Sequence, residues 1–109
     1  MSVARAQLGK PYQWNTAGPD TFDCSGLTMY AYAAAGIQLI HWTGSQAQEG
    51  VPVALDQMAS GDLVFFGADY HHVGIYIGGG QMIDAPHTGS FVQVDPVWST
   101  ASLAIRVTG

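Results

Sequence analysis

The stretch FDCSGLTMYAYAAAG, residues 22–36, contains the only cysteine of the chain and predicts a helix that begins beside it. Asp23 is a suitable N-cap, and Gly36 is a typical stop signal. Between them, apolar residues recur at helical spacing: Cys24, Leu27, Ala31, Ala34 and Ala35. The pattern therefore predicts a helix from Cys24 to Ala35, and its alanines allow another element to pack closely against it.

The position of Cys24 favours a reactive thiol. The first turn of a helix has unpaired amide donors and the positive end of the helix dipole, and both stabilise a thiolate. A single cysteine in this position is, however, more often an inert packing residue. A nucleophile also needs a base, and the base needs a group that orients it. The rest of the sequence must supply both.

The sequence around this helix changes from helical to strand-like patterns. A short helix is predicted at Val3–Leu8, and the polar stretch TGSQAQEG, residues 43–50, predicts a short helix or turn. Residues 62–107 contain short β-branched and aromatic runs bounded by turn residues: DLVFFG, HHVGIYIGGG, QMIDA, SFVQVD and LAIRV. Helices followed by closely spaced strands predict an α+β domain, with the N-terminal helices covering a mostly antiparallel sheet.

Composition limits the classes of function. The 109 residues fit one domain, residues 1–109, and contain three Lys and Arg against eight Asp and Glu. We expect no nucleic-acid partner, because no basic surface is available for phosphates. We also expect no membrane span, because no apolar run is long enough. One cysteine permits no internal disulfide, no secretion signal is recognisable at the start, and the oligomeric state cannot be read from the sequence.

The run HHVGIYIGGGQMIDA, residues 71–85, offers a base and its orienting group. In a regular strand His72 and Gly74 share one face. If Gly78 to Gly80 form the turn, Ile77 faces Gln81 and Asp84 faces Gly74, diagonal to His72 on the same face. A carboxylate could then hold the imidazole. The alternative is a structural histidine and an unrelated turn acid, because this register is assumed.

The other histidines have different predicted places. His71 points away from His72 in a regular strand and is expected to be structural or exposed. His41 and His87 fall in predicted loops and could line a groove, as could Trp42 beside His41. No His-x-x-x-His or Cys-x-x-Cys spacing is present, so no metal site and no cofactor are expected.

Three motifs together resemble the NlpC/P60 family of cell-wall cysteine peptidases. They are GKPYQWNTAGPDTFDCSGLTMYAY (9–32), GDLVFFG (61–67) and HHVGIYIGGGQMIDAPHTG (71–89), and they occur in the order typical of the family. The resemblance extends from about Ala4 to Val107. It implies a papain-like core and hydrolysis of peptidoglycan stem peptides, typically at the bond between γ-D-glutamyl and a diamino acid. It also implies action outside the cell, after export within a longer protein or after delivery by a phage or secretion system.

The resemblance implies a role for several residues. Cys24 matches the nucleophile of the family, His72 its general base and Asp84 its third position, which is often another histidine. Tyr12, Asp23 and Ser25 match positions that line the pocket beside the scissile bond. The Cys24 amide and the Tyr12 hydroxyl are candidate oxyanion donors.

Two stretches depart from the family pattern. WNTAG replaces paired glycines before the nucleophile, and HWTGSQ, which begins at His41, stands where relatives usually have an arginine or small polar residues. Two other functions use the same fold. One is a papain-like acyltransferase or amidase with the same three residues, and the other is a noncatalytic module that binds the cell wall.

Overall fold

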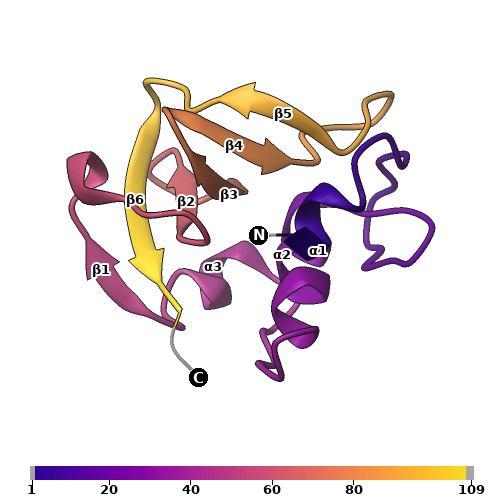
Figure 1. Ribbon diagram of the computed structural model, residues 1–109, viewed down its shortest axis with the longest axis horizontal. Helices are drawn as coiled ribbons and strands as arrows, with labels where there is room; N and C mark the ends of the chain where they lie inside the picture. Colours follow the sequence, from indigo (N-terminus) through magenta and orange to yellow (C-terminus); the bar gives the residue numbers. More distant parts are fainter. Residues whose placement is uncertain (1, 108–109) are drawn as a thin grey trace.

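The computed structural model describes residues 2–107, which form a curved antiparallel sheet with the α-helices on one face (Figure 1). The helices are α1 (Ser2–Arg5), α2 (Cys24–Ala33), α3 (Thr43–Gln46) and the 3-10 helix η1 (Leu55–Gln57). The strands are β1 (Val51–Val53), β2 (Leu63–Phe66), β3 (His72–Gly78), β4 (Gln81–Asp84), β5 (Gln93–Pro96) and β6 (Ala101–Arg106). Within the described residues the strand order is β1-β6-β2-β3-β4-β5. The predicted α+β class with a mostly antiparallel sheet is confirmed.

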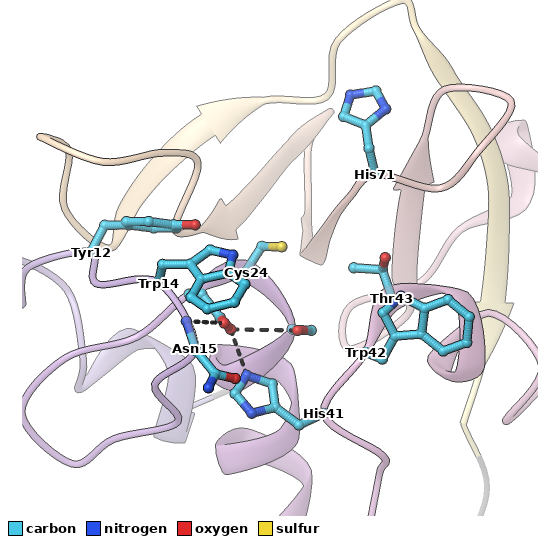
Figure 2. A pocket seen from close by; sticks show the side chains of 10 residues that line it. Tyr12, Trp14, Asn15, Cys24, His41, Trp42, Thr43 and His71 are labelled. Carbon is cyan, nitrogen blue, oxygen red and sulfur yellow. Dashed lines mark hydrogen bonds and ion pairs between the residues drawn. The ribbon is translucent and has the colours of Figure 1, made fainter.

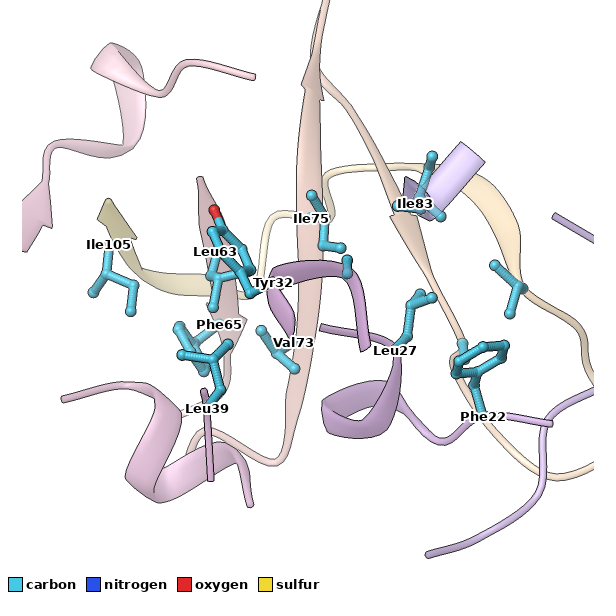
Figure 3. Close-up of a cluster of buried hydrophobic side chains, with 14 of the residues drawn as sticks. Phe22, Leu27, Tyr32, Leu39, Leu63, Phe65, Val73, Ile75, Ile83 and Ile105 are labelled. Atoms are coloured by element: carbon cyan, nitrogen blue, oxygen red, sulfur yellow. The ribbon is translucent and has the colours of Figure 1, made fainter. Parts of the chain in front are cut away.

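The sheet has two apolar faces because its central strands are buried on both sides. One face packs against α2 and the segment after it, and its largest members include Phe22, Leu27, Leu63, Phe65, Val73, Ile75, Ile83 and Ile105 (Figure 3). The other face has a smaller cluster of Val64, Phe66 and Met82. Successive side chains of a strand point to opposite faces of the sheet. The position of a polar residue on β3 or β4 therefore determines the face to which its side chain points.

The helices differ from the predictions mainly at their ends. Helix α1 ends at Arg5 instead of Leu8, α2 ends at Ala33 instead of Ala35, and α3 occupies only the first half of residues 43–50. The amides of Ala35 and Gly36 bond to the carbonyls of Tyr32 and Ala33, so the last predicted turn of α2 is tightened into i to i+3 bonds.

Strand β1 was not predicted, because its three residues include a proline. Pro52 is opposite Ile105 on β6, and β1 is at one edge of the sheet, where a missing amide donor is tolerated. The strand β5 at the other edge ends at Pro96, opposite Gln81.

The predicted register of β3 and β4 is confirmed, although the turn differs. Tyr76 is opposite Met82 and Ile75 is opposite Ile83, as expected. At the turn Gly78, not Ile77, is opposite Gln81, and the register shifts between Tyr76 and Gly78. The connection is therefore a two-residue turn of Gly79 and Gly80 beside a bulge. Both glycines have positive φ, a conformation that glycine adopts without steric cost.

Buried Gln46 connects α3 to α2. Its side-chain amide donates to the carbonyls of Ser25 (2.9 Å) and Ile40 (2.8 Å), and its oxygen accepts from Thr28 Oγ1 at 2.5 Å. A buried amide with all these partners fixes the geometry of its surroundings. Gln46 thus holds the segment containing His41 against the first turn of α2.

Gly26 lies where the loop before α2 crosses the helix. A Cβ atom there would be 2.0 Å from the Thr16 carbonyl oxygen and 2.9 Å from the Ala17 Cα. Both are backbone atoms, so the clash cannot be relieved by a side-chain rotation. The close crossing keeps residues 12–17 beside the beginning of the helix.

We predict that Gly26→Ala destabilises the protein by about 2 kcal/mol, because overpacking outweighs the gain in helix propensity. Urea unfolding would measure this change. The control is Ala33→Gly at the exposed end of the same helix, which should cost at most about 1 kcal/mol. A Gly26→Ala protein as stable as the unsubstituted chain would contradict the close crossing.

Candidate active site around Cys24

Asp23 organises the polypeptide around Cys24. Its Oδ1 accepts from the Gly26 amide at 2.6 Å, and its Oδ2 accepts from the Asn15 amide at 2.8 Å. His41 Nε2 lies 2.8 Å from the same Oδ1. The predicted N-cap is therefore confirmed, and one carboxylate joins the preceding loop, the first turn of α2 and the segment before α3.

Cys24 is the first residue of α2 and lies in a hollow of about 210 Å³. The lining residues are Tyr12, Trp14, Asn15, Asp23, Cys24, Ser25, His41, Trp42, Thr43 and His71. Figure 2 shows the sulfur between Tyr12 and Trp14 on one side and Trp42 and Thr43 on the other. The thiol is free and partly exposed, so a solute can reach it at the helix N-terminus.

Most of the residues predicted to bind substrate line this hollow. Tyr12, Asp23, Ser25, His41 and Trp42 do so, whereas His87 is in the exposed loop after β4, where its Nδ1 lies 3.0 Å from the Thr88 carbonyl oxygen. Sequence reasoning missed Trp14, Asn15 and Thr43. The sequence signal for Trp14 was its place in the same PYQW stretch as Tyr12. In the structure Trp14 is 75% exposed.

The Tyr12 hydroxyl faces two acidic groups. Burial raises the pKa of Tyr12 above 10.0, and the nearby Cys24 and Asp23 raise it further. A hydroxyl that keeps its proton remains a hydrogen-bond donor. Tyr12 can therefore donate to an oxygen beside Cys24.

His72 and Asp84 form a buried pair. His72 Nε2 lies 2.8 Å from Asp84 Oδ2, with side chains 7% and 0% exposed. The imidazole packs against Phe66 at a ring-centroid distance of 5.6 Å and against Trp98 at 5.5 Å. The carboxyl thus engages one ring nitrogen and leaves Nδ1 for another partner.

The structure does not join this pair to the thiol by a hydrogen bond. Among the described residues, His72 bonds through its side chain to Asp84 and not to Cys24. Its ring contacts Phe66, a member of the smaller cluster, whereas Cys24 packs against the larger one. His71 lines the Cys24 hollow and directly precedes His72, so the hollow and the His72–Asp84 pair adjoin at the start of β3.

His71 differs from its neighbour in environment. As expected it is exposed, with a 62% exposed side chain, and its Nδ1 lies 2.8 Å from Asp69 Oδ1. In Figure 2 the His71 ring is well apart from the other lining side chains. His71 is therefore a second histidine and carboxylate pair at the edge of the same hollow.

Asp84 holds its proton unusually strongly. Burial raises the pKa of Asp84 to about 9, assisted by Asp95 and partly opposed by His87. Its other oxygen, Oδ1, is buried without a hydrogen-bond partner among the described residues. Between pH 7 and 9 folded Asp84 thus retains a proton that it releases in an unfolded chain.

Two features are absent from the described residues. They contain no group of three or more His, Cys, Asp or Glu side chains arranged for a metal ion. No helix among them is both long and apolar enough to cross a membrane.

Residues 9–105 match the model of the NlpC/P60 family. The chain belongs to the NlpC/P60 family. It is 44% identical over 106 residues to peptidoglycan endopeptidase RipA of Mycolicibacterium smegmatis, covering 84% of this chain and 21% of RipA. It is 47% identical over 96 residues to a probable endopeptidase p60 of Listeria grayi, covering 86% of this chain and 18% of p60. The chain thus spans about a fifth of the length of these two curated relatives.

Solved NlpC/P60 structures share the fold over nearly the whole chain. The NlpC/p60 domain of the peptidoglycan hydrolase SagA superposes with a TM-score of 0.90 at 37% identity, covering 97% of this chain and 94% of that domain. RipD of Mycobacterium tuberculosis superposes with a TM-score of 0.87 at 32% identity, covering 98% of this chain and 93% of RipD. RipD is described as a non-catalytic NlpC/p60 domain protein adapted to peptidoglycan binding. Other solved structures are of RipA mutated at a cysteine, a histidine or a glutamate, the last two being twelve residues apart.

We predict that Asp84→Asn makes stability less dependent on pH. The pKa of Asp84 is raised on folding, so the stability that its proton contributes is fully present below 3.8 and is lost as the pH rises through about 9. The unsubstituted protein should lose at least about 1 kcal/mol of unfolding free energy between pH 7 and 9, on the basis of roughly 1.4 kcal/mol per pKa unit.

Chemical unfolding at both pH values would test this prediction. Between pH 7 and 9 the Asp84→Asn protein should lose less than half as much unfolding free energy as the unsubstituted chain. The Asp56→Asn protein, changed at an exposed acid, should behave like the unsubstituted chain. Equal pH dependence of the Asp84→Asn protein and the unsubstituted chain would exclude the raised pKa.

Proposed function

We propose that residues 1–109 form a catalytic domain that hydrolyses peptidoglycan stem peptides as a cysteine endopeptidase, at the bond between γ-D-glutamyl and a diamino acid. The observation that carries the proposal is the placement of Cys24 at the N-terminus of α2, in a hollow open to solute. The names of the relatives RipA, p60 and SagA support peptidoglycan as the substrate. On this proposal the protein acts outside the cell, at the wall.

In the proposed reaction Cys24 gives its thiol proton to His72, and the sulfur attacks the carbonyl carbon of the scissile amide. The carbonyl oxygen becomes an oxyanion, to which the Cys24 amide and the Tyr12 hydroxyl can donate. When the carbon–nitrogen bond breaks, the amine leaves with a proton from His72, and an acyl group remains on the sulfur. Water, deprotonated by His72, then releases the acid and restores the thiol.

His72 is the proposed base because Asp84 holds its ring through Nε2. Asp84 engages Nε2, so Nδ1 is the nitrogen that exchanges a proton with the sulfur. The reaction requires His72 Nδ1 to approach Cys24, and the proposal is supported by the preceding residue, His71, which lines the edge of the Cys24 hollow. The spacing of twelve residues between His72 and Asp84 equals that of the histidine and glutamate mutated in RipA.

His71 is the rival base, because it lines the Cys24 hollow and has its own carboxylate, Asp69. A noncatalytic wall-binding role is the second candidate function, favoured by the similarity to RipD. Asp23, Ser25, His41 and Trp42, which line the hollow, are proposed to position the peptide in either case.

We predict that the protein cleaves defined muropeptides at the γ-D-glutamyl bond, and that Cys24→Ala abolishes the cleavage because it removes the attacking sulfur. Mass spectrometry of the products measures both outcomes. His72→Ala should lower the rate at least about 100-fold, the usual contribution of a general base, whereas the matched variant His71→Ala should change it less than about threefold.

Each other outcome supports a different function. A large loss only in His71→Ala would assign the base to His71. Products that retain an added amine in place of water would identify an acyltransferase. Binding of the muropeptides without cleavage, at any pH from 5 to 9, would support the wall-binding module.

A further inference from the structure

Asp95 lies next to Asp84 on the neighbouring strand. In the register of β4 and β5, Met82 is opposite Asp95 and Asp84 is opposite Gln93. Asp95 is therefore diagonal to Asp84 on the same face of the sheet. The charged and titratable groups that act on Asp84 come from three places: His72 on β3, Asp95 on β5 and His87 in the loop after β4.

The two carboxyl groups are held differently. One Asp84 oxygen lies beside His72, and the other, Oδ1, is buried without a donor among residues 2–107. Asp95 is half-buried and accepts from Gln93 Nε2 through its Oδ2 at 2.9 Å. Two adjacent carboxyl groups cannot both ionise without mutual repulsion, and a proton between them removes the repulsion and provides the missing donor.

We propose that Asp95 is a positioning residue that shares one proton with Asp84 Oδ1 and thereby sets the charge that Asp84 presents to His72. The contribution of Asp95 to the high pKa of Asp84 agrees with this arrangement. Gln93 holds Asp95 in place through Oδ2 and leaves its other oxygen for Asp84.

The shared proton has a consequence for the proposed base. While the acid pair keeps its proton, the carboxyl on Nε2 carries less negative charge, so it stabilises imidazolium less than a free carboxylate would. His72 then returns its proton to a leaving amine more readily. This inference rests on the proposed function for its catalytic meaning, but the proton sharing itself is independent of catalysis.

The test is Asp95→Asn, whose side-chain amide can donate to Asp84 Oδ1 without a proton from solvent. Asp84 would then carry more negative charge beside His72, because the contribution of Asp95 to its raised pKa is removed. In the Cys24→Ala background, the midpoint of the His72 ring titration, followed by ¹⁵N NMR, should rise by about one pH unit, the lower end of the effect of a nearby opposite charge. The alkaline limb of the pH–rate profile for muropeptide cleavage should move in the same direction.

Two controls separate the possible outcomes. Asp56→Asn, at an exposed acid, should move neither measurement, and Gln93→Ala should move the His72 midpoint less than Asp95→Asn does. An unchanged midpoint in folded Asp95→Asn protein would overturn the inference. A shifted midpoint in a protein that cleaves no stem peptide would sustain the proton sharing and reject the proposed peptidase.

Discussion

The Asp23 carboxylate is the interaction on which the arrangement of the hollow depends. It accepts from the amides of Asn15 and Gly26 and contacts His41, so three segments distant in sequence meet at one acidic side chain. Because both carboxylate oxygens have hydrogen-bond partners, these contacts offset the cost of its burial. Cys24 directly follows Asp23, so the contacts of Asp23 fix the position of Cys24 at the start of α2.

The sheet provides a second frame that is independent of the first. Residues on β3 and β4 alternate between a face covered by α2 and a smaller cluster, and the polar pair His72 and Asp84 occurs among apolar neighbours such as Phe66. Burial of this pair fixes the imidazole and raises the pKa of the acid. Cys24 and His72, the proposed nucleophile and base, are thus held by different structural elements that meet at the start of β3.

Local patterns predicted much of this arrangement. The start of α2 could be predicted because an N-cap and helical spacing coincide at Asp23, and the pairing of Ile75 with Ile83 followed from a glycine turn. Sequence could not indicate the exact turn, because Gly78, Gly79 and Gly80 all tolerate positive φ. Strand β1 was missed because it is short and depends on β6 for its hydrogen bonds. The association of Asp95 with Asp84 also required the register of β4 and β5, which side-chain alternation alone does not set.

The two edge prolines affect how copies of this domain meet one another. Pro52 on β1 and Pro96 on β5 each lack an amide hydrogen at the boundary of the sheet. An incoming extended chain would find an interrupted row of donors at either boundary, which disfavours growth of the sheet from one molecule into the next. A domain with 48% apolar residues and few charges thereby gains resistance to aggregation through strand addition.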